Sequence, residues 1–117
     1  MSYIDGMVTA VPKANRQAYI DHASKAAELL KSWGATRVVE NWGDDVPRGE
    51  NNDFYGAVQA KDDEVVVFSW IEYPDKATRD AAMQKMMSPE AMKEFGEMPF
   101  DGRRMIFGGF ETLFVVE

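Results

Sequence analysis

Apolar residues along the chain follow two different spacings, and each change of spacing predicts a new element. From Tyr3 to Val11 apolar side chains recur at every second position, which is typical of a strand, and Pro12 ends the segment. From Asn15 the spacing becomes three and four residues, which predicts a helix with an apolar stripe of Tyr19, Ala23, Ala26, Ala27 and Leu30. Asn15 suits its N-cap, and Gly34 suits the first position beyond its C-terminal cap.

The rest of the chain repeats this alternation of strand and helix signals. Period two returns in three segments, which predicts strands over Thr36–Val46, Phe54–Ala60 and Val65–Tyr73, the last two joined as a hairpin by residues 61–64. Asp75 is placed to cap a helix running to about Met87, and Ser88-Pro89-Glu90 begins a short helix that stops at Gly96. A final strand is expected over Arg104–Val116.

This order predicts an α+β protomer of the ferredoxin-like, split βαβ type. One antiparallel sheet would carry the helices on a single face. Both faces of the sheet are apolar, however: on the strand over 65–73, Phe68 and Trp70 point one way while Val67 and Ile71 point the other. Because so apolar a face is not normally left in water, we expect a homodimer in which two sheets close face to face into an α/β barrel.

Composition narrows the classes of function. The 117 residues carry 13 basic and 20 acidic side chains, and the resulting net charge of −7 argues against binding to nucleic acid or to anionic membrane surfaces. A hydrophobic content of 45% is enough for one domain over residues 1–117 without disulfides, and the chain has no cysteine. No apolar run approaches the ~20 residues of a membrane span, and the N-terminus lacks the basic start of a signal peptide, so we expect a cytoplasmic protein.

Two pairs of residues are candidates for acid–base chemistry. Glu40 lies two positions from Trp42, and Glu72 lies two positions from Trp70, so each carboxylate shares a sheet face with an indole. Apolar surroundings raise the pKa of a carboxyl group and suit it to general acid–base catalysis. The alternative is that the indoles belong to the core and the glutamates pair with Arg37, Arg103 or Arg104 at a strand end or at a dimer seam.

The single histidine and the methionines offer further chemistry, each with a plainer alternative. His22 is either a general base or a locally hydrogen-bonded residue beside the apolar stripe of its helix. Six of the eight methionines lie in the range from Met83 to Met105. They either pack in the core or line an adaptable pocket. Copper binding by their thioethers is poorly supported, because no cysteine or histidine lies nearby. The acidic clusters at 44–45 and 62–64 lack the spacing of a calcium loop, so we expect no metal and no cofactor.

Four blocks of sequence carry a resemblance to a known family. They are Trp42–Pro47, Phe68–Pro74, Gln84–Met87 and Met98–Ile106, and in this order they resemble the YbaA-like family of small bacterial proteins, domain of unknown function 1428. The resemblance spans essentially the whole chain. It implies a ferredoxin-like protomer of the dimeric α/β-barrel superfamily, whose members include cofactor-free monooxygenases, haem-degrading enzymes and isomerases with pockets between sheet and helices. It implies no catalytic residues for this chain.

We therefore expect a homodimer that binds a small, partly apolar molecule, with cofactor-free oxidoreductase or isomerase chemistry as one outcome. Trp42 and Trp70 would supply flat walls, and Glu40, Glu72 or His22 would accept a proton. Further lining residues would be Met83 and Met105, with Arg104 orienting an acidic substrate. The competing hypothesis is a non-catalytic assembly or ligand-sensing module, in which the two glutamates are paired across the dimer seam.

Overall fold

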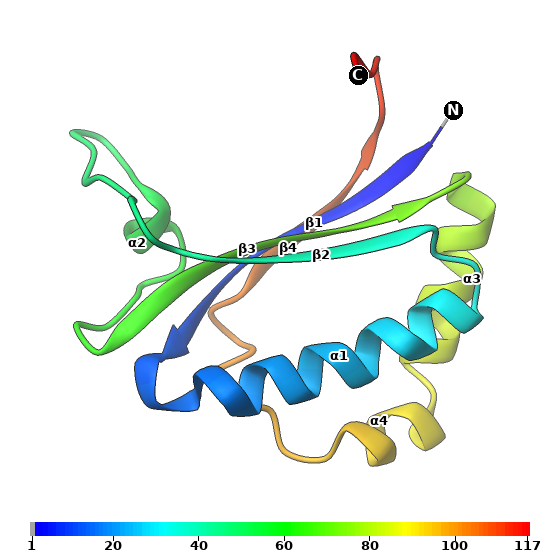
Figure 1. Ribbon diagram of the computed structural model, residues 1–117, viewed down its shortest axis with the longest axis horizontal. Coiled ribbons are helices and arrows are strands. Elements are labelled where there is room, and N and C mark those ends of the chain that lie inside the picture. Colours follow the sequence, from blue (N-terminus) through cyan, green and yellow to red (C-terminus); the bar gives the residue numbers. More distant parts are fainter. Residues whose placement is uncertain (1) are drawn as a thin grey trace.

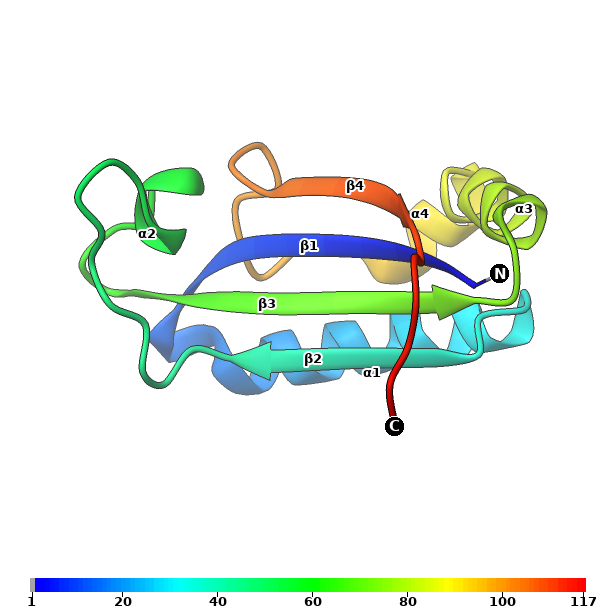
Figure 2. The same ribbon diagram turned by 90° about the horizontal axis from the view of Figure 1, so that it is seen from above.

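Four antiparallel strands form one sheet in the order β2-β3-β1-β4 in this computed structural model, which describes residues 2–117. The strands are β1 (Tyr3–Pro12), β2 (Arg37–Trp42), β3 (Glu64–Tyr73) and β4 (Ile106–Glu111). The helices are α1 (Arg16–Ser32), α2 (Phe54–Ala57), α3 (Lys76–Met86) and α4 (Pro89–Phe95), and a single 3-10 turn (Lys13–Asn15) precedes α1. Figure 2 shows the four strands side by side in this order.

The helices α1, α3 and α4 all lie on one face of the sheet (Figure 1). Strand β3 pairs with both β1 and β2, so it lies between the two strands that α1 connects. Strand β1 likewise lies between β3 and β4, which α3 and α4 connect. This interleaving confirms the ferredoxin-like α+β fold with a split βαβ arrangement.

Side-chain caps fix where the helices begin and end, as the sequence predicted at most positions. The Asp75 carboxylate accepts a hydrogen bond from the backbone N–H of Thr78 at 2.8 Å, and Ser88 caps α4 through Ala91. Gly34 follows α1 with a φ of +112°, a conformation that side-chain-bearing residues rarely adopt. Asn15 is the N-cap of α1 but its side chain makes no capping bond; the side-chain amide donates to the Pro99 carbonyl at 2.9 Å.

The main core lies between the sheet and the helices. Tyr73, Ile71 and Leu30 form one buried cluster, and Val11, Tyr19 and Val67 form another. Both clusters use the odd-numbered residues of β1 and β3, which the register places on the helix side of the sheet. The even-numbered residues therefore face the opposite side, which we call the open face.

The predicted strand over Phe54–Ala60 is wrong, and with it the hairpin to residues 65–73. Asp53 accepts a hydrogen bond from the backbone N–H of Gly56 at 2.6 Å and thereby starts the one-turn helix α2. Gln59 then adopts a positive φ of 51°. The segment covers one end of the open face, where Val58 is fully buried against even-numbered residues of β1 and β3, among them Val8 and Val66.

Two strands, β2 and β4, are shorter than predicted. Strand β4 pairs only with β1, from Val8↔Ile106 to Tyr3↔Glu111, and the backbone N–H of Thr112 adds one bond to the Ser2 carbonyl at 3.2 Å. Residues 113–116 lie beyond the start of β1 and have no neighbouring strand to extend the ladder. Before β4, Arg104 is held in a turn by Asp101. Strand β2 pairs with β3 only as far as Trp42, and Gly43 adds one further backbone bond to Val66 at 2.9 Å.

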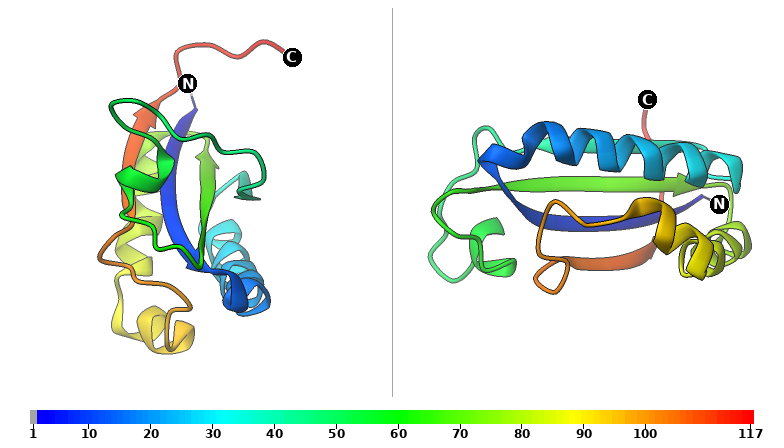
Figure 3. Two further views of the ribbon diagram at one scale, coloured as in Figure 1. Left: turned by 90° about the vertical axis from the view of Figure 1, so that its left-hand side faces the viewer. Right: turned by 90° about the horizontal axis from the view of Figure 1, so that it is seen from below.

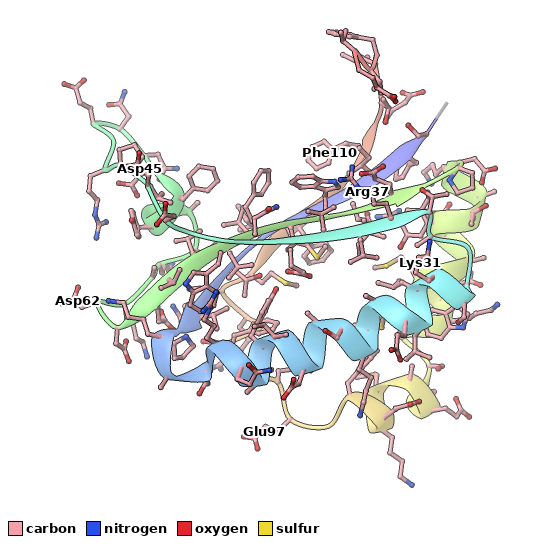
Figure 4. All side chains as sticks on the ribbon, in the orientation of Figure 1. Lys31, Arg37, Asp45, Asp62, Glu97 and Phe110 are labelled. Carbon is pink, nitrogen blue, oxygen red and sulfur yellow. The ribbon has the colours of Figure 1, made fainter. Side chains whose placement is uncertain are left out.

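Beyond the part covered by Val58, the open face carries apolar side chains that nothing in residues 2–117 covers. Phe68 is 47% exposed and Phe110 is 60% exposed. Figure 4 shows Phe110 on the side of the sheet opposite α1. Residues 113–117 leave the sheet on this same side (Figure 3), and Leu113, Phe114, Val115 and Val116 are all largely exposed. Within the described residues, no helix has the length and apolar character needed to cross a membrane.

Candidate functional site

The two Glu–Trp pairs lie on opposite faces of the sheet. Glu40 is opposite Ser69 in the β2–β3 register, and both residues face the helices. Trp70 and Glu72 follow the even-numbered side of β3 and belong to the open face. The structure therefore does not bring the two carboxylates together as an acid–base pair.

A cavity of about 200 Å³ lies between the sheet and the helices, on the same side as Glu40. At ~30 Å³ per molecule in the liquid, this is roughly the volume of seven waters. Strands β1, β2 and β3, helices α1 and α3, and the segment after α4 all contribute to its walls. The polar lining consists of Thr9, Tyr19, His22, Glu40 and Ser69. The apolar lining is formed by Met7, Ala23, Ala26, Ala27, Leu30, Val38, Ile71, Met83, Met86, Met98, Phe100 and Met105.

Glu40 stands at the rim of this cavity. Because β2 is an edge strand, the residue as a whole is exposed, but its hydrogen bond to Tyr19 is partly buried. The Tyr19 hydroxyl donates to Glu40 Oε1 at 2.6 Å. Burial raises the pKa of Glu40, while hydrogen bonds from Tyr19 and Ser69 act in the opposite direction. The net result is a carboxylate that is more basic than one in water.

Tyr19 itself is fixed as a hydrogen-bond donor. The residue is only 7% exposed, and its ring packs against Phe100 with a centroid separation of 5.7 Å. Burial, reinforced by the negative charge of Glu40, raises the pKa of the phenol well above its usual range. Tyr19 therefore keeps its proton at neutral pH, and Glu40 is the group in this pair that can accept one.

His22 lines the same cavity, one helical turn after Tyr19 on α1. Its Nε2 atom is buried and has no hydrogen-bond partner within residues 2–117. The ring lies 5.7 Å from that of Phe95 and 6.2 Å from that of Phe100. Burial, together with the nearby positive charge of Lys25, lowers the pKa of His22, so the imidazole is neutral at pH 7.

The methionines divide between the cavity and the surface. Met83 and Met86 of α3 line the cavity, whereas Met87, at the C-cap of the same helix, is 68% exposed. Met7, Met98 and Met105 complete a set of five thioether side chains around one space. Such flexible, polarizable side chains adapt to the shape of an apolar ligand.

The remaining predicted residues lie away from the cavity. Trp42 packs beside the cluster of Val11, Tyr19 and Val67, with the Arg16 guanidinium 5.5 Å from its ring centroid. Arg104 is held by Glu64 at 2.7 Å and by Asp101 at 3.1 Å.

On the open face, the Trp70 indole donates to Glu72 at 2.9 Å. Arg37 lies 3.4 Å from the same carboxylate oxygen. Of the residues singled out from the sequence, the structure therefore gathers Glu40, His22, Met83 and Met105 around one cavity.

Sequence reasoning assigned no site role to three polar residues of the lining: Thr9, Tyr19 and Ser69. Tyr19 was assigned only to the apolar stripe of its helix. Ser69 is the one polar residue in the run Val65–Ile71, and it is only 1% exposed. A small hydroxyl in so apolar a strand, together with Thr9 on the neighbouring strand, is the signal that marks a polar spot beneath the sheet.

Metal chemistry has little support in the arrangement of ligands. Residues 2–117 contain no group of three or more His, Cys, Asp or Glu side chains placed to hold a metal ion. In the acidic clusters, the aspartates at 44, 45, 62 and 63 are exposed, whereas Glu64 is buried and paired with Arg104. What the cavity offers instead is one carboxylate, one neutral imidazole and two small hydroxyls in an otherwise apolar space.

Comparison with solved structures agrees with the fold. The chain is similar to SnoaB, a cofactor-independent oxygenase from Streptomyces nogalater, with a TM-score of 0.59 at 12% identity over 98% of this chain and 96% of that one. It is also similar to a dimeric ferredoxin-like protein from an uncultured marine organism, with a TM-score of 0.53 at 17% identity over 99% and 97% of the two chains. Likenesses at this level of identity establish the fold alone.

Sequence comparison establishes the family. The chain is 60% identical over 114 residues to the uncharacterized protein YbaA of Escherichia coli K12, which covers 97% of both chains. YbaA of Shigella flexneri matches to the same extent. The model of the family described as "Protein of unknown function (DUF1428)" matches residues 2–102. This chain therefore belongs to the DUF1428 family.

Proposed function

We propose that this protein binds a small, partly apolar molecule in the cavity between its sheet and its helices, and that Glu40 accepts a proton or a hydrogen bond from that molecule. One observation carries the proposal: a carboxylate of raised pKa stands at the rim of an apolar cavity, positioned by Tyr19. Among the described residues, no Lys or Arg pairs with Glu40.

The chemistry this arrangement supports is proton transfer without a cofactor. Tyr19 and Ser69 donate hydrogen bonds to the carboxylate, whose two oxygens have about four lone-pair sites and so keep acceptor capacity for a bound molecule. A raised pKa brings the group closer to neutrality, where a general base is most effective. Removal of a proton opens both isomerisation and direct oxidation by oxygen, and SnoaB, described as a cofactor-independent oxygenase, shares the fold.

We further propose that the protein is a homodimer joined through the open face. Two hollows of about 230 and 550 Å³ lie there between Phe68, Phe110 and their neighbours, and they can receive side chains of a second copy. The exposed residues 113–116 add apolar surface on the same side. Two structural neighbours at similar TM-scores are themselves described as dimeric. Dimerisation through this face leaves the cavity, on the other face, free for a ligand.

The competing function, a non-catalytic assembly module, is favoured by one observation on Glu72. This carboxylate is bonded to Trp70 and Arg37 on the proposed dimer face, so its role fits assembly rather than catalysis. Variants of Glu40 and Glu72 therefore distinguish the two hypotheses. Glu40 lines the cavity that ligand binding requires, and Glu72 lies on the face that the assembly hypothesis requires.

Native mass spectrometry of the protein as purified, combined with two matched variants, tests the proposal. We expect a species at twice the chain mass of 13.2 kDa, with any retained small molecule released on denaturation. Glu40→Gln should lose that molecule, or any turnover found with it, and remain a dimer. Glu72→Gln should keep the molecule and dissociate more readily. A Glu40→Gln variant that retains the ligand and its turnover at the wild-type level would contradict the proposed role of Glu40.

A further inference from the structure

We propose that the cavity selects small apolar amines, with the ammonium group of the ligand bound to Glu40 and the apolar part held among the methionines and Phe100. The inference rests on the proposed function and names the class of molecule that the cavity accepts. It follows from the charges and hydrogen-bonding groups of the lining.

The lining carries one acidic group and no strongly basic one. Among the described residues that line the cavity there is no Lys and no Arg, and His22 is the one group there with a basic side chain. Because burial holds the imidazole in its neutral form at pH 7, the only formal charge in the cavity is that of Glu40. A bound carboxylate or phosphate would be repelled by that charge, whereas a cation would be attracted.

The two buried carboxylates among residues 2–117 already have a cationic partner. Asp5 is 5% exposed and lies 2.9 Å from the Arg79 guanidinium. Glu64 is 7% exposed and lies 2.7 Å from Arg104. Glu40, although closer to solvent than either, is held only by neutral hydroxyl donors. An ammonium group on the ligand would supply the partner that the protein provides at the other two positions.

The polar groups of the cavity can accept more hydrogen bonds than they can donate. A carboxylate only accepts, and the Tyr19 hydroxyl has already committed its proton to Glu40. Neutral His22 has one donating and one accepting ring nitrogen, and its buried Nε2 has no partner within residues 2–117. Thr9 and Ser69 add hydroxyl oxygens that also accept. A ligand that donates several hydrogen bonds fits this set, and a primary ammonium has three N–H donors.

The apolar part of the lining also favours a cation. Aromatic faces attract ammonium groups, and Tyr19 and Phe100 both contribute rings to the wall. The five methionines are polarizable and adapt to alkyl or aryl groups of different shapes. At longer range, the net charge of −7 draws cations towards the protein and keeps anions away.

Three probes of nearly equal size test the inference by isothermal titration calorimetry on the full chain: benzylamine, benzyl alcohol and benzoate. We expect benzylamine to bind at least about tenfold more tightly than benzyl alcohol, the effect of one charge-assisted hydrogen bond, and benzoate to show no saturable binding. Glu40→Gln, which keeps the shape of the side chain and removes its charge, should abolish the preference for the amine. Glu72→Gln, which removes a carboxylate from the other face, should leave it unchanged. Ala26→Leu, which narrows the cavity from α1, should weaken benzylamine, with circular dichroism confirming that the variant is folded.

The outcomes separate this inference from the proposed function. If benzyl alcohol binds as tightly as benzylamine and both are weakened by Ala26→Leu, the cavity is a binding site without the amine preference, and only the inference fails. Tightest binding by benzoate would overturn the inference in the same way. If no probe binds, or if binding is indifferent to Ala26→Leu in a folded variant, the inference and the proposed function both fail.

Discussion

Replacing Phe110 by serine should weaken the homodimer strongly while leaving the protomer folded. Phe110 lies on the open face and is 60% exposed in the single chain, so its side chain contributes little to the protomer's own core. Burial of a whole phenylalanine side chain stabilises by roughly 1.5–3 kcal/mol, so burial of the exposed part contributes about 1.5 kcal/mol. A two-fold interface contains each residue twice, which gives about 3 kcal/mol for the dimer and about a hundredfold in the dissociation constant.

A matched control lies three residues away on the same strand. Phe107 is 66% exposed, but the register places it opposite Met7, on the other face of β4. Phe107→Ser therefore removes a similar apolar side chain from the opposite face of the strand. Because Phe107 also borders the smaller of the two hollows, this variant should weaken the dimer less than Phe110→Ser does. Sedimentation equilibrium over a range of concentrations measures the dissociation constants of both variants and of the parent chain.

Three results would refute the reasoning. The parent chain would be a monomer at every concentration, Phe110→Ser would dimerise as tightly as the parent, or Phe107→Ser would weaken the dimer as much as Phe110→Ser does. The third result would place the interface on the edge of β4 rather than on the open face.

Three further predictions concern the protomer itself. Arg104→Met should lower the free energy of unfolding by about 2–3 kcal/mol, because the Glu64 side chain, 4% exposed, would lose its partner. The control Arg103→Met, at a side chain 93% exposed, should be nearly neutral. Urea titration compares the two variants. The bonds to Arg104 lower the pKa of Glu64 below its ordinary value of 4.5, so this stabilisation is complete above that value and is lost as the pH falls through the lowered pKa. Urea titrations between neutral and acid pH should therefore show a flatter loss of stability for Glu64→Gln than for the parent chain. An equally steep loss in both would count against this assignment. Gly34→Ala should destabilise the protein by about 2–3 kcal/mol, since a Cβ there would meet the Thr78 methyl at a backbone φ of +112°. Gly96→Ala, with a φ of +64° and open space around it, should cost only about 1 kcal/mol. Equal shifts in melting temperature for the two variants would show that the contact with Thr78 does not matter.

Most of the fold could be predicted from local patterns because its strands are amphipathic and its helix ends carry suitable capping residues. The failure at Phe54–Ala60 has a specific cause. Phe54 and Tyr55 have strong strand propensity, but Asp53 closes a helical turn on Gly56, and Val58 is needed as a cover for the end of the open face. Tertiary packing and a side-chain cap outweighed propensity there. Strand length was also overestimated at β4, because it depends on the length of the partner strand β1 rather than on β4's own sequence.

The candidate site was only partly predictable for a similar reason. The period of two correctly predicted that the two members of each Glu–Trp pair lie on one face of the sheet. It did not predict whether the pair on β2 and the pair on β3 share the same face, because that depends on the register of the two strands. Glu40 and Glu72 consequently separated onto opposite sides of the sheet. The cavity brings His22 beside Met83 and Met86, residues some sixty positions apart in sequence, and no local pattern encodes that contact. The hydrogen bond from Tyr19 to Glu40 likewise depends on the packing of α1 against β2, which no local pattern in the sequence encodes.

Strand β3 has a consequence for how this family can diverge. Its odd-numbered residues Ser69 and Ile71 line the cavity, while Phe68 and Trp70 between them face the other way. Substitution can therefore change the chemistry of one side without disturbing the other, so that ligand preference and self-association evolve independently. Insertion or deletion of a single residue within Glu64–Tyr73 would instead exchange the two sets of side chains and destroy both surfaces at once. Across relatives we therefore expect the residues of β3 to vary while its length stays constant.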